Sequence, residues 1–546
     1  MMGQNLKEKD KFQNLVDRYL EDYWESFPIE ATLNGIHKYD HLLGETNREF
    51  YIQRIKKLKE FSQELIEKID HSSLDHEDQL DQKLLNKLIE FSIIELEHLR
   101  FYQRNPSFYI PIEGISSLLL RDFASLEERL VNVSKRLRGF PSYLDGAKRN
   151  LENPPKIWTL LAIENCKGAI YFLEHMISEF GTMIPELEKE LSKAYQEGMS
   201  SLQSYKSFLE EKLAPNSFGD FALGQEWFNY YLKHWYMLDY PLEELEKIGE
   251  ETLLSTEEKM ENLARRINRG KNWYQIVEEM KEKHPTKDNL KQVCRKEMEK
   301  AKEFIKEKNL VTIPLGEKID VIDTPVLFRK TMSFGGYYPA TPFNPDEAGF
   351  YMVTPVDPKL SPQEEEEFLR GYNIYWVRVV ALHECYPGHH LQFSIAHRLP
   401  SKIRRIYRND FLIEGWALYC EEMMNEQGFY PDLQTRISQL RMMLWRAARV
   451  VIDVGLHTKK MSFEDAVDFL VSRVKMERAH AEAEVKRYTL TPTQPLTYLI
   501  GMLEIGKIKE AYMQKVKGDF SLLEFHDKLL SFGAIPLKLI TERILD

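Results

Sequence analysis

Apolar side chains recur at helical spacing through most of the first three hundred residues. The clearest examples are residues 60–69 and 84–100, where apolar positions fall three and four apart, as on one face of an amphipathic helix. Short breaks rich in Pro, Asn and Gly separate such stretches at 104–107, 152–155 and 214–220. None of these breaks has the composition of a flexible linker, so the pattern predicts a packed, mainly helical protein.

The pattern changes between residues 311 and 356. Val, Ile, Thr and Pro dominate there, on both sides of the segment SFGGYYPA (333–340). This composition is typical of strands and turns, so it predicts a small β-sheet with a loop. Helical periodicity returns after residue 365 and continues almost to the end. We therefore expect a mainly α fold in which 311–356 is a small β insert.

Composition and charge narrow the class of protein. The chain of 546 residues has a net charge of −12, so no global positive field exists to hold nucleic acid. No apolar run approaches the roughly 20 residues needed to cross a bilayer, and the polar amino terminus lacks the apolar core of a secretory signal. The four cysteines form no paired motif, which favours a reducing compartment. We expect a cytoplasmic protein that binds neither nucleic acid nor membrane.

The densest group of chemically active side chains lies near the middle of the segment 379–399. It consists of His383, Glu384, His389 and His390. In the usual zinc-protease helix, two histidines four positions apart face one ion. Here the residue four positions after His383 is a proline, and an unbroken helix brings neither later histidine to a metal bound by His383.

The helix must therefore deform between the histidines. Pro387 removes a backbone donor and crowds the preceding turn, while Gly388 can adopt positive φ without steric cost. This pair predicts an interruption that brings His389 or His390 back towards His383.

A catalytic zinc takes three protein ligands and a water molecule. Glu414, in the predicted helix 409–423, is the best candidate for the third ligand. Glu384 directly follows His383, so we expect it near the bound water as a general base. The residues predict one Zn²⁺, and Mn²⁺ or Co²⁺ is compatible with the same ligand set.

Several segments of the chain resemble the domain-of-unknown-function family 885: HECYPGHHLQ, EGWALYCEE, RAARVVIDVGLH, EVKRY, FHDKLLSFGAIPLKLI and RYLEDYWESFPIEATLNGIHKYD. The resemblance extends over nearly the whole chain. Members of that family are regarded as gluzincin-like zinc peptidases with a His-Glu-x-x-Pro-Gly-His-His motif and an elongated, two-lobed helical fold with a deep cleft. The resemblance therefore implies one large two-lobed domain over 1–546, with the metal-binding and catalytic helices in 365–546.

The resemblance also implies roles for particular residues. By position, it points to His383, His389 and Glu414 as metal ligands and to Glu384 as the base. His390 is the alternative second ligand, and His389 is favoured because a two-residue loop-out is the smaller distortion. The implied activity is hydrolysis of short peptides by metal-activated water, with neither the cleavage position nor the oligomeric state specified.

Other polar residues are candidates for contacts with the substrate. His457, Arg487 and Tyr488 lie in segments that match the family, and each is either an oxyanion donor or a structural group. Arg449 is the arginine that we expect to bind a substrate carboxylate, with pairing to acidic side chains as the alternative.

The glycine and tyrosine residues of the segment 333–340 have two interpretations. Gly336, Tyr337 and Tyr338 are compatible with a substrate-facing hairpin that pairs with an extended peptide. They are equally compatible with a tight turn whose tyrosines pack against the core.

Two other classes of protein fit parts of the sequence. A non-catalytic metal-binding helical scaffold would use the same histidines but would not need Glu384. A di-iron carboxylate protein is suggested by the Glu-x-x-His spacing at 95–98 and 477–480. With 15 His and 86 acidic residues in the chain, about two such pairs are expected by chance. Their presence is therefore weak evidence for a di-iron site.

Overall fold

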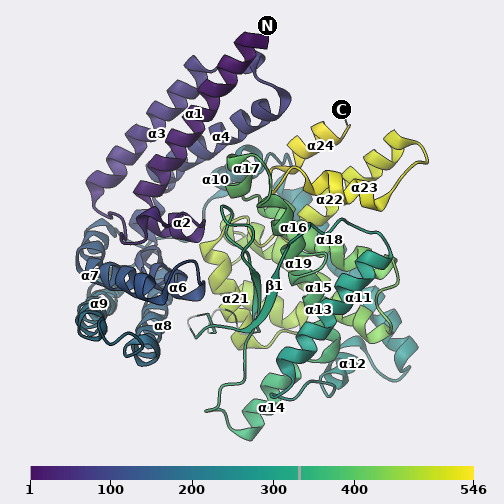
Figure 1. Cartoon of the computed structure of the whole chain (residues 1–546). Helices are drawn as coiled ribbons and strands as arrows, with labels where there is room; N and C mark the ends of the chain where they lie inside the picture. Colours follow the sequence, from purple (N-terminus) through teal and green to yellow (C-terminus); the bar gives the residue numbers. More distant parts are fainter. Residues whose placement is uncertain (1, 327, 330–331, 333, 546) are drawn as a thin grey trace. The chain divides into compact units, whose positions relative to one another are not determined.

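Two compact helical units make up the part of the chain that the computed structural model describes, which is residues 2–326, 328–329, 332 and 334–545 (Figure 1). The first unit runs to Phe221 and also includes Thr341–Asn344 and Ser401–Ile406. The second unit contains the rest of the described chain. The fold is mainly α with one small sheet in this part of the chain, which confirms the predicted fold class.

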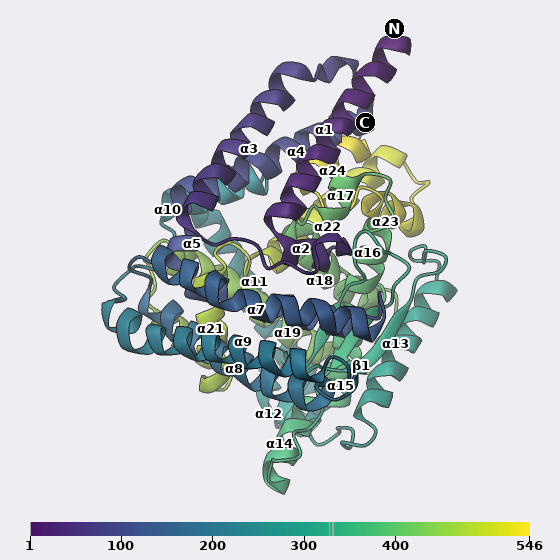
Figure 2. The same ribbon diagram turned by 60° about the vertical axis from the view of Figure 1, so that its left-hand side comes forward.

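The first unit contains ten of the labelled helices of the described chain, and the longest of them are amphipathic. In chain order the ten helices are α1 (Met2–Ser26), α2 (Pro28–Leu33), α3 (Arg48–Lys68), α4 (His76–Ile94), α5 (Phe101–Arg104), α6 (Glu113–Leu120), α7 (Leu126–Asn150), α8 (Lys156–Phe180), α9 (Glu188–Phe208) and α17 (Lys402–Ile406). Helices α7, α8 and α9 lie side by side (Figure 2). Leu130 and Leu137 of α7 and Leu202 of α9 are fully buried, as their helical spacing predicts.

The second unit contains fourteen of the labelled helices of the described chain: α10 (Gln225–Tyr230), α11 (Leu242–Ile267), α12 (Trp273–Met280), α13 (Leu290–Glu307), α14 (Pro362–Gly371), α15 (Ile374–Glu384), α16 (His389–Ala396), α18 (Asp410–Glu426), α19 (Leu433–His457), α20 (Phe463–Phe469), α21 (Arg478–Leu490), α22 (Thr497–Val516), α23 (Leu522–Leu530) and α24 (Leu537–Leu545). Helix α19 packs along α11, and α18 packs along α22. These pairs bury long apolar faces, so α18 and α19 are fixed at the centre of the unit.

The sheet of the second unit has three strands, β1 (Ile319–Asp323), β2 (Gly336–Tyr338) and β3 (Gly349–Val353). Their order is β1-β3-β2, with β1 parallel and β2 antiparallel to β3. All three lie within the predicted insert 311–356, which confirms a sheet there. Strand β2 is an edge strand, so one side of its backbone is free of partners from this sheet.

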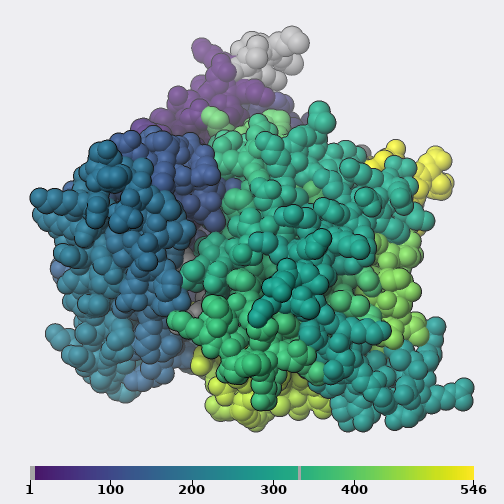
Figure 3. Space-filling model, turned by 60° about the horizontal axis from the view of Figure 1, so that its bottom comes forward, coloured from purple at the N-terminus to yellow at the C-terminus, as the bar shows by residue number. Residues whose placement is uncertain are grey.

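Figure 3 shows the molecular surface in the same colours, purple to blue for most of the first unit and teal to yellow for most of the second. None of the described helices is both long enough and apolar enough to span a membrane. The four cysteines are all buried and unpaired.

Candidate metal centre

The helix that carries the histidine motif is interrupted where the sequence predicts. Helix α15 ends at Glu384 and α16 begins at His389. The intervening turn is fixed by two hydrogen bonds: Trp416 Nε1 donates to the carbonyl oxygen of Pro387 at 2.8 Å, and the backbone N–H of Gly388 donates to that of Leu382 at 3.1 Å. The turn is therefore held by α18 as well as by its own backbone.

Gly388 has a different reason to be glycine than the one we expected. Its φ is −69°, so it does not use the left-handed region. A Cβ atom at this position would lie 1.8 Å from the carbonyl oxygen of His383. The turn folds back so closely on the end of α15 that no side chain fits, and the expectation of positive φ was wrong.

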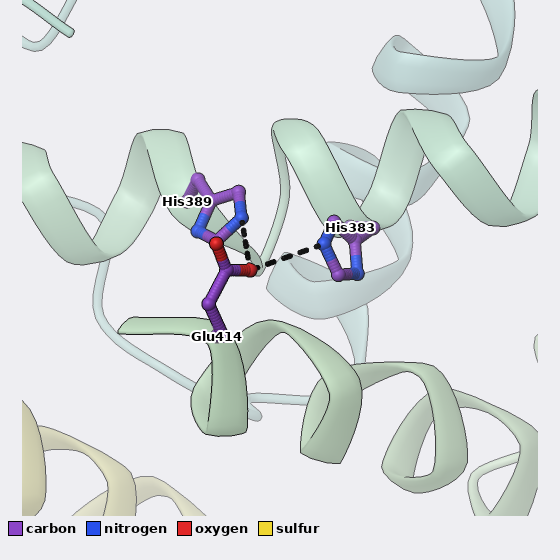
Figure 4. A group of neighbouring side chains, drawn as sticks. All are labelled: His383, His389 and Glu414. Carbon is purple, nitrogen blue, oxygen red and sulfur yellow. Dashed lines mark ion pairs between the residues drawn. The ribbon is translucent and has the colours of Figure 1, made fainter. Parts of the chain in front are cut away.

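Three side chains converge at this interruption: His383 from α15, His389 from α16 and Glu414 from α18 (Figure 4). The Oε2 atom of Glu414 lies 3.9 Å from His383 Nε2 and 3.4 Å from His389 Nε2. One ligand atom from each residue lies within 4.8 Å of the others. A tetrahedral zinc ion separates its ligand atoms by roughly 3.4 Å, so the group has nearly the spacing that zinc requires.

The orientation of His383 is set by a second carboxylate. Its Nδ1 atom lies 2.8 Å from Oε1 of Glu421, which is fully buried. A carboxylate accepts hydrogen bonds, so Nδ1 carries the proton and the lone pair is on Nε2, the atom that faces Glu414. This support of a histidine by a carboxylate is usual at metal sites.

Glu414 has the properties of a metal ligand. Its Oε2 atom is buried and makes no hydrogen bond to any residue that the structure describes. Burial raises the pKa of Glu414, but the nearby His389, His383 and Tyr498 outweigh it and bring the pKa to about 2. A buried, ionised oxygen without a donor is costly, and a divalent cation between it and the two imidazoles would remove that cost. The residues therefore fit Zn²⁺.

His390 faces a different cluster. Its Nε2 atom donates to Oε2 of Glu317 at 2.6 Å, and its Nδ1 atom accepts from the Tyr337 hydroxyl at 3.1 Å. Glu317 also accepts from the Tyr386 hydroxyl at 2.7 Å and from Lys302 Nζ at 2.6 Å. Both ring nitrogens of His390 are thus occupied, and the structure does not place it with His383 and Glu414.

Glu384 lies between the metal group and the sheet. Its Oε2 atom accepts the backbone N–H of Tyr337 in β2 at 2.9 Å. Burial lowers the pKa of His389, whereas the carboxylates of Glu414 and Glu384 raise it and prevail. Glu384 is therefore close enough to the histidine group to act on it electrostatically.

The predicted substrate-facing residues Gly336, Tyr337 and Tyr338 form the edge strand β2. Tyr337 faces the histidine motif through both its backbone and its hydroxyl. Tyr338 is partly exposed, and its ring lies 6.1 Å from that of Phe328. The first residue of the quoted segment, Ser333, lies outside the described residues.

Close packing of α18 on α22 brings Tyr498 to the metal group. The two helices touch at Gly415 and Gly501, where a Cβ on Gly501 would lie 2.0 Å from the carbonyl oxygen of Phe411. Tyr498 lies one turn before Gly501, and Glu414 directly precedes Gly415. The crossing point therefore places Tyr498 near Glu414, the third member of the metal group.

Arg449, Arg487 and Tyr488 form a second cluster, in which Glu484 is shared. Arg449 Nη2 and Arg487 Nη2 both donate to Oε2 of Glu484, at 3.1 and 3.0 Å. Arg449 Nε also donates to the Tyr488 hydroxyl at 2.9 Å. Tyr488 is fully buried and already hydrogen-bonded, so the structure places it as a support for Arg449.

His457 holds segments of the second unit together. Its Nδ1 atom accepts the backbone N–H of Leu223 at 3.3 Å, and its Nε2 atom donates to the carbonyl oxygen of Tyr488 at 3.0 Å. The side chain is fully buried. With both ring nitrogens bonded to backbone groups, His457 has the contacts of a structural residue.

Sequence reasoning missed three residues beside the site. Glu421 lies seven positions after Glu414, on the same face of α18, and this spacing was a usable signal. Tyr498 and Glu317 had no such signal, because each reaches the histidine motif only through tertiary packing.

Two solved structures share this fold. One is described as a putative lipoprotein of unknown function from Shewanella oneidensis, with a TM-score of 0.82, 23% identity and coverage of 98% of this chain and 100% of that one. The other is described as the putative lipoprotein from Colwellia psychrerythraea, with a TM-score of 0.83, 18% identity and 98% of each chain covered. No curated protein matches the chain.

The expected cytoplasmic location is contradicted by these two neighbours, because both are described as lipoproteins. The expectation depended partly on four unpaired cysteines, and buried, unpaired thiols are compatible with more than one compartment. We withdraw it.

The family comparison covers nearly the whole chain. The model of a family described as bacterial protein of unknown function (DUF885) matches residues 28–544. This agrees with the resemblance seen in the motifs on both sides of the sheet insert. The chain therefore belongs to the DUF885 family.

Proposed function

We propose that the protein is a zinc-dependent peptidase that hydrolyses short peptides. The observation that carries this proposal is the convergence of His383, His389 and Glu414 beside the carboxylate of Glu384. Two histidines and one carboxylate are a common ligand set of catalytic zinc, and three protein ligands leave a position for water. The same ligand residues can also bind Mn²⁺ or Co²⁺.

The surrounding residues would each have a defined task. Zinc would supply an acidified water and polarise the carbonyl group of the scissile bond. Glu384 would take a proton from the water and give it to the leaving amine. The hydrogen bond from Tyr337 fixes the position of this carboxylate, and Glu421 fixes the ring of His383. The deep cleft implied by the family resemblance stays a prediction.

The two alternative classes have weaker support. A structural zinc site prefers four closed protein ligands, whereas the group found within the described residues has three. In a di-iron bundle the ligands project inward, but the side chains of His480 and Glu477 are 60% and 76% exposed. The peptidase proposal gives a task to His383, Glu384, His389 and Glu414 together.

The test is the variant Glu384→Gln. We expect it to keep its zinc, because Glu384 is not a ligand, and to lose peptide hydrolysis by about 1,000-fold or more, because the proton acceptor is gone. Zinc is measured by elemental analysis, and hydrolysis by digestion of a peptide library followed by mass spectrometry. The matched control is Glu426→Gln, a half-exposed acid at the end of α18. Equal cleavage by wild type and Glu384→Gln would reject the proposal.

A further inference from the structure

Two buried guanidinium groups on α19 are incompletely paired. Arg446 and Arg449 are 5% and 4% exposed. The Nε atom of Arg446 and the Nη1 atom of Arg449 are buried and have no hydrogen-bond partner among the residues that the structure describes. Buried donors are almost always bonded, so two orphaned donors side by side indicate a missing acceptor.

Few ion pairs are formed by these arginines within the described chain. Arg449 shares the single carboxylate of Glu484 with Arg487. Arg446 forms no ion pair with any described carboxylate, and its Nη1 atom has only a 3.4 Å contact with a backbone carbonyl. Asp453, on the same helix, forms no ion pair with either arginine, and burial raises its pKa well above the ordinary range. The buried carboxylates of Glu421 and Glu414 act on Arg446 without forming an ion pair with it, so its unpartnered donor is left for a further acceptor.

Tyr498 connects this cluster to the metal group. The guanidinium carbon of Arg449 lies 4.6 Å from the centre of the Tyr498 ring, and that of Arg446 lies 5.5 Å from it. The same tyrosine lies close enough to Glu414 for each to shift the pKa of the other. One partly exposed side chain thus separates the metal group from the unpaired donors. An anion bound by the arginines would lie next to a substrate held at the metal.

We propose that Arg446 and Arg449 bind a carboxylate group of the substrate, on the far side of Tyr498 from Glu414. Guanidinium groups recognise carboxylates through paired, charge-assisted hydrogen bonds. The carboxylate belongs to the carboxyl terminus of a peptide or to an acidic side chain, and the two sources share this chemistry. The inference deepens the proposed peptidase function and rests on it for the identity of the ligand.

Binding to the metal-free protein tests the inference without catalysis. Three N-acetylated tripeptides serve as probes: one with uncharged side chains and a free carboxyl terminus, its carboxyl-terminal amide, and an amide that contains glutamate. After removal of metal by a chelator, affinity is measured by isothermal titration calorimetry. We expect at least one carboxylate-containing peptide to bind about 10-fold to 100-fold more tightly than the neutral amide. Preference for the first or the third peptide identifies the source.

Two variants and a control connect the preference to these side chains. We expect Arg449→Gln, and separately Arg446→Gln, to bind the charged and neutral peptides with similar affinity. Arg478→Gln on α21 changes a half-exposed arginine and should keep the wild-type preference. Thermal unfolding shows which variants are folded. Arg449→Lys keeps the positive charge, so it should retain part of the preference for carboxylate-containing peptides.

The results separate this inference from the proposed function. Equal affinity of wild type for all three peptides, no binding of any of them, or an unchanged preference in both glutamine variants overturns the inference. Cleavage of neutral and charged peptides at equal rates would overturn it too, while leaving the peptidase proposal intact. A carboxylate preference in a protein that cleaves no peptide would support the arginine site and reject the peptidase.

Discussion

His389 and His390 are the first two residues of the same helix, and their rings lie in two different clusters of polar side chains. On the His390 side, both ring nitrogens and both oxygens of Glu317 have close partners. On the His389 side, Nδ1 of His389 and Oε2 of Glu414 make no hydrogen bond within the described chain. Both clusters are buried and rich in charge, so burial alone does not distinguish them.

The difference shows how to separate support from ligand binding. A cluster whose donors and acceptors are matched stabilises the fold and needs nothing further. A cluster with unmatched buried atoms is stable only when something else binds there, such as a metal ion at Glu414 or an anion at Arg446 and Arg449. Two adjacent histidines of identical chemistry thus acquire different roles from their surroundings.

The largest expected effect comes from exchanging the histidines one at a time. We expect His389→Gln to weaken zinc binding by more than about 100-fold, because a ligand is lost. Loss of a residue that only supports a ligand weakens metal binding by about 10-fold to 100-fold. We expect His390→Gln to keep zinc affinity within about tenfold and to lower the free energy of unfolding by about 1–3 kcal/mol, because Glu317 loses a buried donor. Competition with a chelating dye and urea unfolding measure the two quantities. Loss of zinc in His390→Gln alone would reverse the assignment.

The turn between α15 and α16 separates the two clusters, so a change there should disturb both. In Gly388→Ala the new Cβ meets the carbonyl oxygen of His383 at 1.8 Å. We expect the free energy of unfolding to fall by about 4 kcal/mol or more. The control is Gly506→Ala in α22, where nothing lies within 4 Å of the added Cβ and where we expect a gain of up to about 1 kcal/mol. Equal stability of the two variants would show that the turn tolerates a side chain.

Acid should weaken the matched cluster. Burial raises the pKa of Glu317, but hydrogen bonds from His390 and two other donors lower it to about 2, below the ordinary value of 4.5. A lowered folded pKa gives a stabilisation that is complete above pH 4.5 and is lost as the pH falls towards 2.

This contribution is about 3 kcal/mol at most. The difference in unfolding free energy between wild type and Glu317→Gln should therefore shrink as the pH falls from 5 to 3. Urea unfolding at each pH measures this difference. The control is Glu299→Gln, which changes an exposed residue of α13. A constant difference would show that folding does not lower the pKa of Glu317.

Local patterns predicted the fold class well, because helical periodicity and strand composition are properties of short segments. The sheet insert is an example, since all three strands lie between 311 and 356. The interruption at Pro387 and Gly388 was also predictable, because the spacing of the histidines required it. Its steric cause was not, since the contact of Gly388 with His383 depends on how tightly the turn closes.

The site could be predicted only in part, because several of its contacts join residues that are far apart in the sequence. His383, His389 and Glu414 could be grouped from motif spacing, and the structure brings them together. The partner of His390 is Glu317, 73 residues earlier in an unremarkable loop. His457 and Tyr488 were candidates for catalysis because they lie in segments that match the family, but their hydrogen bonds connect segments of the protein. A polar residue in an apolar run is also what a buried structural bond requires.

All four thiol groups lie in the interior of the units, and burial raises the pKa of each. Thiolate, the form that reacts with alkylating reagents and with peroxide, is therefore scarce in the folded protein at neutral pH. Cys385 directly follows Glu384, yet it is shielded from such reagents as fully as the others. The native protein should accordingly keep its properties in oxidising and in reducing surroundings alike.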